Sequence, residues 1–161
     1  VGTRELLRTL HVQFSQATQS GTDTTGAANN IGTSATNLRL DGAAAADGRG
    51  VVVGRAAAPT AFAWNQTALD TIISTGNAAE QLAYQIVIFG SVTSNRRFLV
   101  TRSFINNSGA SITNGITEMA LYSNPSNLGT GGRSLMLARN VPTALAVAAS
   151  AIAVAEYTIE I

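Results

Sequence analysis

The C-terminal third of the chain consists of short apolar runs between turn-forming residues, and no other feature limits the fold as strongly. The runs span residues 116–122, 135–141, 144–147 and 152–161, and they are rich in β-branched, aromatic and aliphatic side chains. Clusters of Asn, Pro, Ser and Gly separate most of them. Such a pattern is typical of an antiparallel β-sheet in which each run is one strand.

Earlier segments of the chain continue this pattern. Strands are predicted at residues 50–54, 84–89 and 97–105, and the Asn and Gly content of residues 106–110 predicts a turn. With the C-terminal runs, the strands follow one another at roughly ten-residue spacing. We therefore expect an all-β fold: an antiparallel β-sandwich of jelly-roll or immunoglobulin-like kind, with one short helix and an extended N-terminal arm.

Residues 67–76 have the pattern of that short helix. Thr67 and Asp70 have the spacing of a capping box, and Leu69, Ile72 and Ile73 would share one face. Gly76 would then end the helix as its C-terminal stop.

The last run, residues 152–161, changes its alternation half-way. Ile152 and Val154 share one parity, whereas the large apolar residues from Tyr157 onward have the other. One extra residue would return all of them to a single buried face, so the sequence predicts a β-bulge at Ala155–Glu156.

The N-terminal part of the chain lacks the apolar content of a folded domain. Residues 15–36 are nearly all Ser, Thr, Gly, Ala, Asn and Gln, with Ile31 as their one sizeable apolar side chain. Such a segment buries too little to offset the entropy of ordering itself. We predict an extended, low-complexity arm over residues 1–48, which depends on neighbours for its order, and a β-sandwich body over residues 49–161. The amphipathic stretch 4–14 fits a helix or a strand equally well.

Composition limits the classes of partner. At 161 residues the chain has the size of one domain that can fold without a disulfide or a metal ion. Charged residues make up only 12 %, and the formal net charge is +1, so no electrostatic footprint for nucleic acid or membrane is present. All ten basic residues are Arg, which suits interfaces but also follows from a G/C-rich genome.

The chemistry of an enzyme is not visible in the sequence. His11 is the only histidine, cysteine is absent, and the carboxylates are scattered. The nearest carboxylate pair, Glu156 and Glu160, has the even spacing of a solvated strand face; a glycosidase pair is the weaker alternative. We therefore predict that the protein is not an enzyme and has no catalytic residue, no cofactor and no metal site.

Several weaker motifs have ordinary structural interpretations. The glycine pairs at 48–50 and 129–132 lack the surroundings of a phosphate-binding loop and are expected to be turns. Arg96–Arg97 is expected to lie in a solvated turn, although it has the composition of a small anion site. The sequons at Asn65 and Asn106 matter only in a eukaryotic secretory setting.

The order of motifs in the body resembles small virion structural proteins of tailed bacteriophages. The resemblance extends over about residues 50–161. The segments that carry it are Gly50–Gly54, the helix-like Ala68–Ile73, Gln81–Tyr84, Phe98–Ile112, Glu118–Tyr122, Leu135–Val141 and Tyr157–Ile159. The resemblance implies no catalytic residues.

What the resemblance implies is a capsid decoration or cement protein. Such a protein binds the major capsid protein on the outside of an icosahedral head, ties coat subunits together as a homotrimer, and has neither nucleic acid nor membrane as a partner. It would be located in the virion, on the capsid surface, after synthesis in the host cytoplasm. A tail, baseplate or head-fibre component is the alternative. A carbohydrate-binding module that uses Trp64 with Tyr122 or Tyr84 is a third possibility, although a single Trp more often fills its own core.

Overall fold

The computed structural model describes residues 19–31, 39–60, 65–90, 97–123 and 134–160. Over these ranges the chain is all-β and contains no helix. Its strands are β1 (Gln19–Thr22), β2 (Ala28–Ile31), β3 (Gly50–Arg55), β4 (Thr71–Ile72), β5 (Ala83–Phe89), β6 (Arg97–Ile105), β7 (Ile112–Ile116), β8 (Glu118–Ser123), β9 (Leu135–Asn140), β10 (Leu145–Val147) and β11 (Ile152–Glu160).

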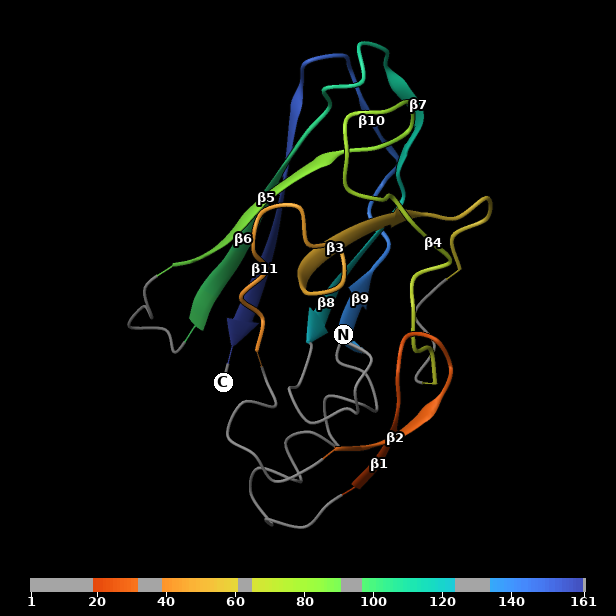
Figure 1. The fold of residues 1–161 in the computed structure, drawn as a ribbon, viewed down its shortest axis with the longest axis vertical. Coiled ribbons are helices and arrows are strands. Elements are labelled where there is room, and N and C mark those ends of the chain that lie inside the picture. Colours follow the sequence, from red (N-terminus) through yellow and green to blue (C-terminus); the bar gives the residue numbers. More distant parts are fainter. Residues whose placement is uncertain (1–18, 32–38, 61–64, 91–96, 124–133, 161) are drawn as a thin grey trace.

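Two larger sheets form the body (Figure 1). One has the strand order β4-β3-β8-β9 and the other the order β11-β6-β5, while β1-β2 and β10-β7 are two-stranded. All of these strand pairs are antiparallel. The predicted all-β antiparallel class is therefore confirmed, and β6 has the predicted bounds. Of the strands in the body, β4 and β7 were not predicted.

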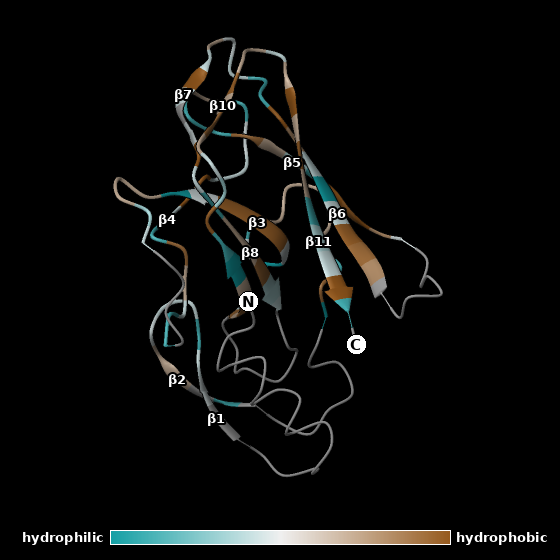
Figure 2. Ribbon diagram, turned by 180° about the vertical axis from the view of Figure 1, so that it is seen from behind, coloured by the Kyte–Doolittle hydropathy of each residue, from teal (hydrophilic) through white to brown (hydrophobic). Residues whose placement is uncertain are grey.

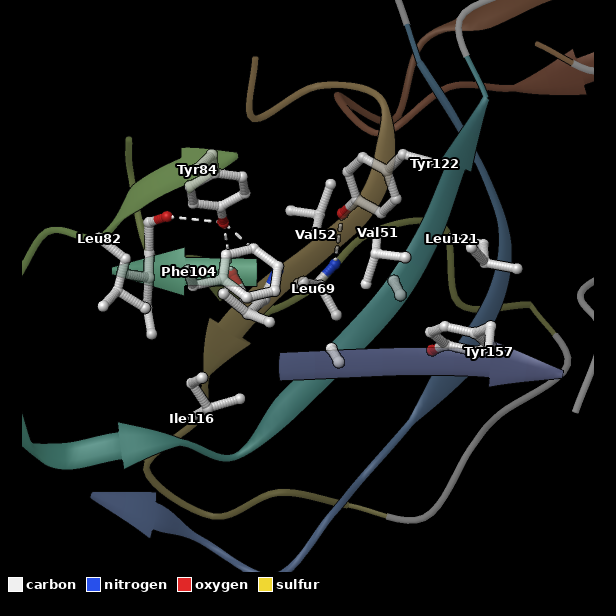
Figure 3. Close-up of a cluster of buried hydrophobic side chains, with 14 of the residues drawn as sticks. Val51, Val52, Leu69, Leu82, Tyr84, Phe104, Ile116, Leu121, Tyr122 and Tyr157 are labelled. Atoms are coloured by element: carbon white, nitrogen blue, oxygen red, sulfur yellow. Dashed lines mark hydrogen bonds between the residues drawn. The ribbon is translucent and has the colours of Figure 1, made fainter. Parts of the chain in front are cut away.

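The four-stranded sheet is covered on both faces. Val51, Val52 and Val53 are all fully buried, although successive side chains of a strand point to opposite faces. On one face, the hydroxyl of Tyr84 from the three-stranded sheet contacts the backbone of Val53 (Figure 3). On the other face, the segment around Leu69 covers β3. The apolar core thus lies between the two larger sheets, with a further layer behind β3.

A buried ion pair lies beneath that further layer. Arg139 donates through two guanidinium nitrogens to Glu118, with Nε 2.9 Å from Oε1, and both side chains are fully buried. Glu118 also accepts the backbone N–H of Asp70 at 2.9 Å, and Arg139 donates to the carbonyl of Thr60 at 3.1 Å. The pair therefore connects β8 and β9 to the covering segment.

The predicted helix over residues 67–76 is wrong. The segment is extended, and its only strand is the two-residue β4. The backbone N–H groups of Leu69, Asp70 and Ile73 donate to a tyrosine hydroxyl, a carboxylate and a β3 carbonyl, and not to carbonyls one helical turn earlier. Tertiary partners have replaced the local hydrogen bonds that the capping pattern predicted.

The predicted bulge at Ala155–Glu156 is also wrong. β11 pairs with β6 in unbroken register over its whole length. Ala153, Ala155 and Tyr157 are buried, whereas Ile152 and Val154 are exposed. The prediction failed because it assumed that the larger side chains of the strand must face the core.

A second buried arginine joins the two sheets. Arg102 on β6 is fully buried, and its guanidinium lies 4.7 Å from the centre of the Tyr84 ring. Burial lowers its pKa to about 10, an effect that the nearby Tyr84 and Asp47 oppose. Its N–H groups donate at 2.7–3.0 Å to the backbone carbonyls of Ala43, Arg49, Val51 and Gln85.

The turn after β6, which the sequence predicted, is held by the buried side chain of Asn106. Its Nδ2 donates to the carbonyls of Ala110, Val147 and Ala148 at 2.8, 2.9 and 3.1 Å. Its Oδ1 accepts the backbone N–H of Ser108 at 3.1 Å. One amide therefore ties this turn to the turn that precedes β11.

Part of the predicted arm has defined structure. β1 and β2 form a hairpin whose turn is held by Asp23, and the backbone N–H of Thr24 donates to the carbonyl of Ser134. Farther along, the carbonyl of Gly42 accepts the N–H of Val87. The division at residue 49 stays a prediction, and the first eighteen residues lie outside the described ranges.

Candidate functional site

The three-stranded sheet has an apolar face turned away from the core, which we call the outer face. Five large aliphatic side chains with exposed fractions of 39–61 % define it: Ile86, Ile88, Leu99, Ile152 and Val154. The strand register places Ile88, Thr101 and Glu156 in one row across the sheet. Figure 2 shows hydrophobic residues along β5 and β6. No described residue covers this face.

The two edges of this sheet differ. At the β5 edge, Val87 donates its N–H to Gly42, and the carbonyl of Tyr84 accepts the N–H of Ala45. At the β11 edge, no described segment pairs with the strand, because its only ladder is with β6. Within the described ranges, the outer face therefore ends at an open strand edge.

A cleft of about 410 Å³ lies on the inner side of that edge. Its walls come from both larger sheets and from the segment before β10. Ala153 and Ala155 are among its lining residues, and their small side chains leave the space open. The other lining residues are Val53, Phe104, Ile116, Met119, Pro142, Thr143, Leu145, Val154 and Glu156. Apolar surface thus lies on both sides of β11.

The candidate residues from the sequence do not converge on a chemical site. Glu156 and Glu160 are exposed on β11, as expected for a solvated strand face. His11 and Trp64 lie outside the described residues, as does Arg96. Among the residues that the structure describes, no group of three or more His, Cys, Asp or Glu side chains is placed to hold a metal ion.

The carbohydrate-binding role considered for Tyr84 and Tyr122 is wrong. Tyr84 and Tyr122 are 2 % and 1 % exposed, and their hydroxyls bond to backbone groups inside the protein. Burial raises the pKa of Tyr122 to about 12 and raises that of Tyr84 further. Asn106 of the second sequon is fully buried, so it is not available for glycosylation, whereas Asn65 is exposed.

Sequence reasoning missed the outer face. Its signal was present in β11, where the large residues Ile152 and Val154 alternate with the small residues Ala153 and Ala155. We interpreted the larger set as core, because burial of large aliphatic side chains is the ordinary outcome. The alternation identified two apolar faces, and the structure shows which one is turned outward.

Comparison with protein-family models, with curated proteins and with solved structures finds no match to this chain. In the part of the chain that the structure describes, no helix is long and apolar enough to cross a membrane.

Proposed function

We propose that the protein is a viral structural protein, a decoration or cement protein that stabilises the head of a tailed bacteriophage by binding across coat subunits. The observation that carries this proposal is the outer face, which ends at the open edge of β11. An exposed apolar patch beside an open strand edge is typical of a protein–protein contact. The virion context comes from the phage-like order of motifs in the body.

The fold proposed for this role is a β-sandwich of jelly-roll or immunoglobulin-like kind. Two features support it: the larger sheets are antiparallel, and they share one apolar core. Arg102 and the hydroxyl of Tyr157 both bond to backbone carbonyls of the opposite sheet, at 3.0 Å to Val51 and 2.7 Å to Met119. Such cross-sheet bonds make the body rigid, and a rigid body loses little entropy when it binds.

Such a protein stabilises the head because it buries additional surface area across the seams between coat subunits. The body supplies one contact, and the N-terminal arm predicted from the sequence, residues 1–48, supplies a second one on a neighbouring subunit. Two linked contacts strengthen attachment without a single tight site. The proposed partners are the major capsid protein and further copies of this chain, arranged as a homotrimer on the capsid surface.

A tail, baseplate or head-fibre component is the second candidate function, because the same motif order and the same apolar face fit a tail contact. Copy number separates the two. Quantitative gel analysis of purified virions should show hundreds of copies for a cement protein; a few copies per particle would establish the tail assignment and overturn the cement proposal.

Deletion of residues 1–18 tests the mechanism. This truncation is preferable to removal of residues 1–48, because the longer deletion would also take away Ala43, whose carbonyl accepts a bond from buried Arg102. Particles assembled with the truncated protein should lose it, or should rupture at lower temperature, while urea unfolding of the isolated truncated protein stays unchanged. Full occupancy and full particle stability would contradict the proposed two-contact mechanism.

A further inference from the structure

We propose that residues 4–12 of one copy add as a strand to the open edge of β11 in the next copy, antiparallel to it. The inference deepens the proposed function, on which it rests for its biological setting, because it names a contact between copies of the homotrimer. It leaves the outer face to the coat subunits and assigns the first part of the arm to a neighbouring copy. It is carried by matching charges, by matching aliphatic side chains and by the reach of the chain.

The open edge of β11 presents unpaired backbone groups and two carboxylates. Its only ladder among the described residues is with β6, so alternate N–H and C=O groups of the strand point away from the sheet. Glu156 and Glu160 are exposed and lie four residues apart on the same side of the strand. Two β11 edges paired about a two-fold axis would set Glu156 opposite Glu156, because it is the middle residue of β11. The edge therefore favours a strand that brings positive charge.

The proposed strand carries positive charge with the same spacing. Arg4 and Arg8 are also four residues apart, and Glu5, the only acidic residue between them, has the other parity. In an antiparallel ladder, the register that sets Arg4 opposite Glu160 also sets Arg8 opposite Glu156. Opposite charges in such cross-strand pairs are stabilising. The two carboxylates of the edge therefore both gain a partner.

The same register matches the aliphatic residues. Leu10 comes to lie opposite Val154, and two residues farther on Val12 lies opposite Ile152. Val154 and Ile152 are 55 % and 61 % exposed, so the added strand covers part of each while it widens the outer face. Parallel pairing can also match the two arginines to the two glutamates, but it carries Leu10 and Val12 past the end of β11. Only the antiparallel register matches charges and aliphatic side chains together.

The register also fits the inner side of β11. Ala153 and Ala155 are small and line the cleft of about 410 Å³, so there is room beside them. The register places His11 opposite Ala153. It places Thr9 opposite Ala155, and Thr143 is a polar neighbour in the same cleft. The added strand would therefore cover part of the cleft.

The reach of the chain selects a second copy over the same chain. The few residues between Val12 and Gln19, where β1 begins, span at most about 25 Å. β11 is about 27 Å long from Ile152 to Glu160. β1 lies beyond the Glu160 end of β11 in both views of the fold (Figures 1 and 2). A strand that ends with Val12 beside Ile152 therefore cannot come from the same chain.

An arm that passes from each copy to the next makes a contact between two different surfaces. Such head-to-tail contacts close into rings when the rotation between copies allows it. A ring of three agrees with the homotrimer of the proposed function, and its linked contacts strengthen one another.

Sedimentation velocity of the full chain between about 1 and 100 µM tests the charge match. The wild type should shift from monomer toward trimer, and Arg8→Glu should weaken this association about tenfold because it sets two carboxylates opposite each other. The double variant Arg8→Glu with Glu156→Arg should restore the association to within about threefold of the wild type. Arg55→Glu is the matched control, since Arg55 lies on β3 beside Glu80 and its change should leave the association intact. A wild type that stays monomeric, or a double variant no better than the single one, would overturn the proposal.

Disulfide formation tests the register and the identity of the partner. The chain has no cysteine, so Leu10→Cys with Val154→Cys introduces two thiols that the register sets directly opposite, within the Cα separation that a disulfide needs. Mild oxidation should join these chains into covalent dimers and trimers on a non-reducing gel. Leu10→Cys with Glu160→Cys is the matched control, because the antiparallel register places these residues about 20 Å apart, whereas the parallel one brings them close. A disulfide within single chains of the first variant, or preferential joining of the second, would refute the exchange.

Both experiments use isolated protein, so they separate this inference from the proposed function. Monomers that still decorate heads at hundreds of copies would contradict this inference alone. Trimers that are present at a few copies per virion would contradict only the cement proposal.

Discussion

The two larger sheets have similar strands but different surroundings. In the four-stranded sheet both faces are buried, one against the three-stranded sheet and the other beneath the segment around Leu69. In the three-stranded sheet only the inner face is buried, although the outer face also carries large aliphatic side chains. The difference shows that apolar content does not by itself identify the core, because the three-stranded sheet leaves large aliphatic side chains exposed on its outer face.

The buried ion pair offers the strongest test of the covered side. Arg139→Met removes the cation and leaves Glu118 charged, buried and without its arginine, which should lower the free energy of unfolding by about 3–5 kcal/mol. Arg55→Met is the matched control, because its partner Glu80 is half exposed and such pairs contribute less than ~1 kcal/mol. Urea unfolding measures both. Similar losses in the two variants would show that the segment over β8 and β9 does not exclude water.

The same substitution in each sheet compares the two faces directly. Val52→Ala should cost about 2 kcal/mol, because two buried methyl groups lose their contacts behind β3. Val154→Ala should change the free energy of unfolding by less than ~0.5 kcal/mol, because Val154 is more than half exposed. The measurement is urea unfolding at low protein concentration. A large loss at Val154 under these conditions would mean that the outer face is covered within one chain.

The stability at alkaline pH tests the hydrogen bond between Tyr122 and the segment around Leu69. Tyr122 accepts the N–H of Leu69 at 2.9 Å, so Tyr122→Phe should cost about 1 kcal/mol at neutral pH. Burial raises the pKa of Tyr122 to about 12, above the value of about 10 in an unfolded chain. Its contribution is therefore fully present below pH 10 and is lost as the pH rises toward 12.

The difference between wild type and Tyr122→Phe isolates this tyrosine, because the other titrating groups are common to both proteins. The stability gap between them should shrink from pH 10 to pH 12, and absorbance at 295 nm should show no ionisation of Tyr122 near pH 10 in the folded state. A gap that stays constant with pH would mean that the hydroxyl is open to solvent.

Much of the fold followed from the sequence. The bounds of β6 were predicted correctly because β-branched and aromatic residues lie between clear turn signals, and the turn at Asn106 was predicted from its Asn and Gly content. Residues 67–76 were mispredicted because a capping pattern is local, whereas the groups that bind its N–H donors come from Tyr122, Glu118 and Val53, which lie 53, 48 and 20 residues from those donors. The spacing of apolar residues along the chain does not indicate such distant hydrogen-bond partners.

The sequence shows that β11 carries two apolar sets of side chains, but it does not show which set faces away from the core. The alternation in β11 shows two apolar sets, and the rule that large aliphatic residues are buried selects the wrong one. That rule fails where a chain keeps apolar surface for a partner. The hairpin of β1 and β2 was not predicted, because its turn is held by the carboxylate of Asp23, a contact that apolar patterning does not indicate.

The turn held by Asn106 has a consequence for chemical durability. The Asn106 side chain holds both turns because its Nδ2 donates to three backbone carbonyls at 2.8–3.1 Å and its Oδ1 accepts the backbone N–H of Ser108. Hydrolysis of the amide, to which Asn side chains are prone at high temperature, would replace that nitrogen by a carboxylate oxygen and set an anion against the three carbonyls. A change of one heavy atom would then weaken both turns that Asn106 joins.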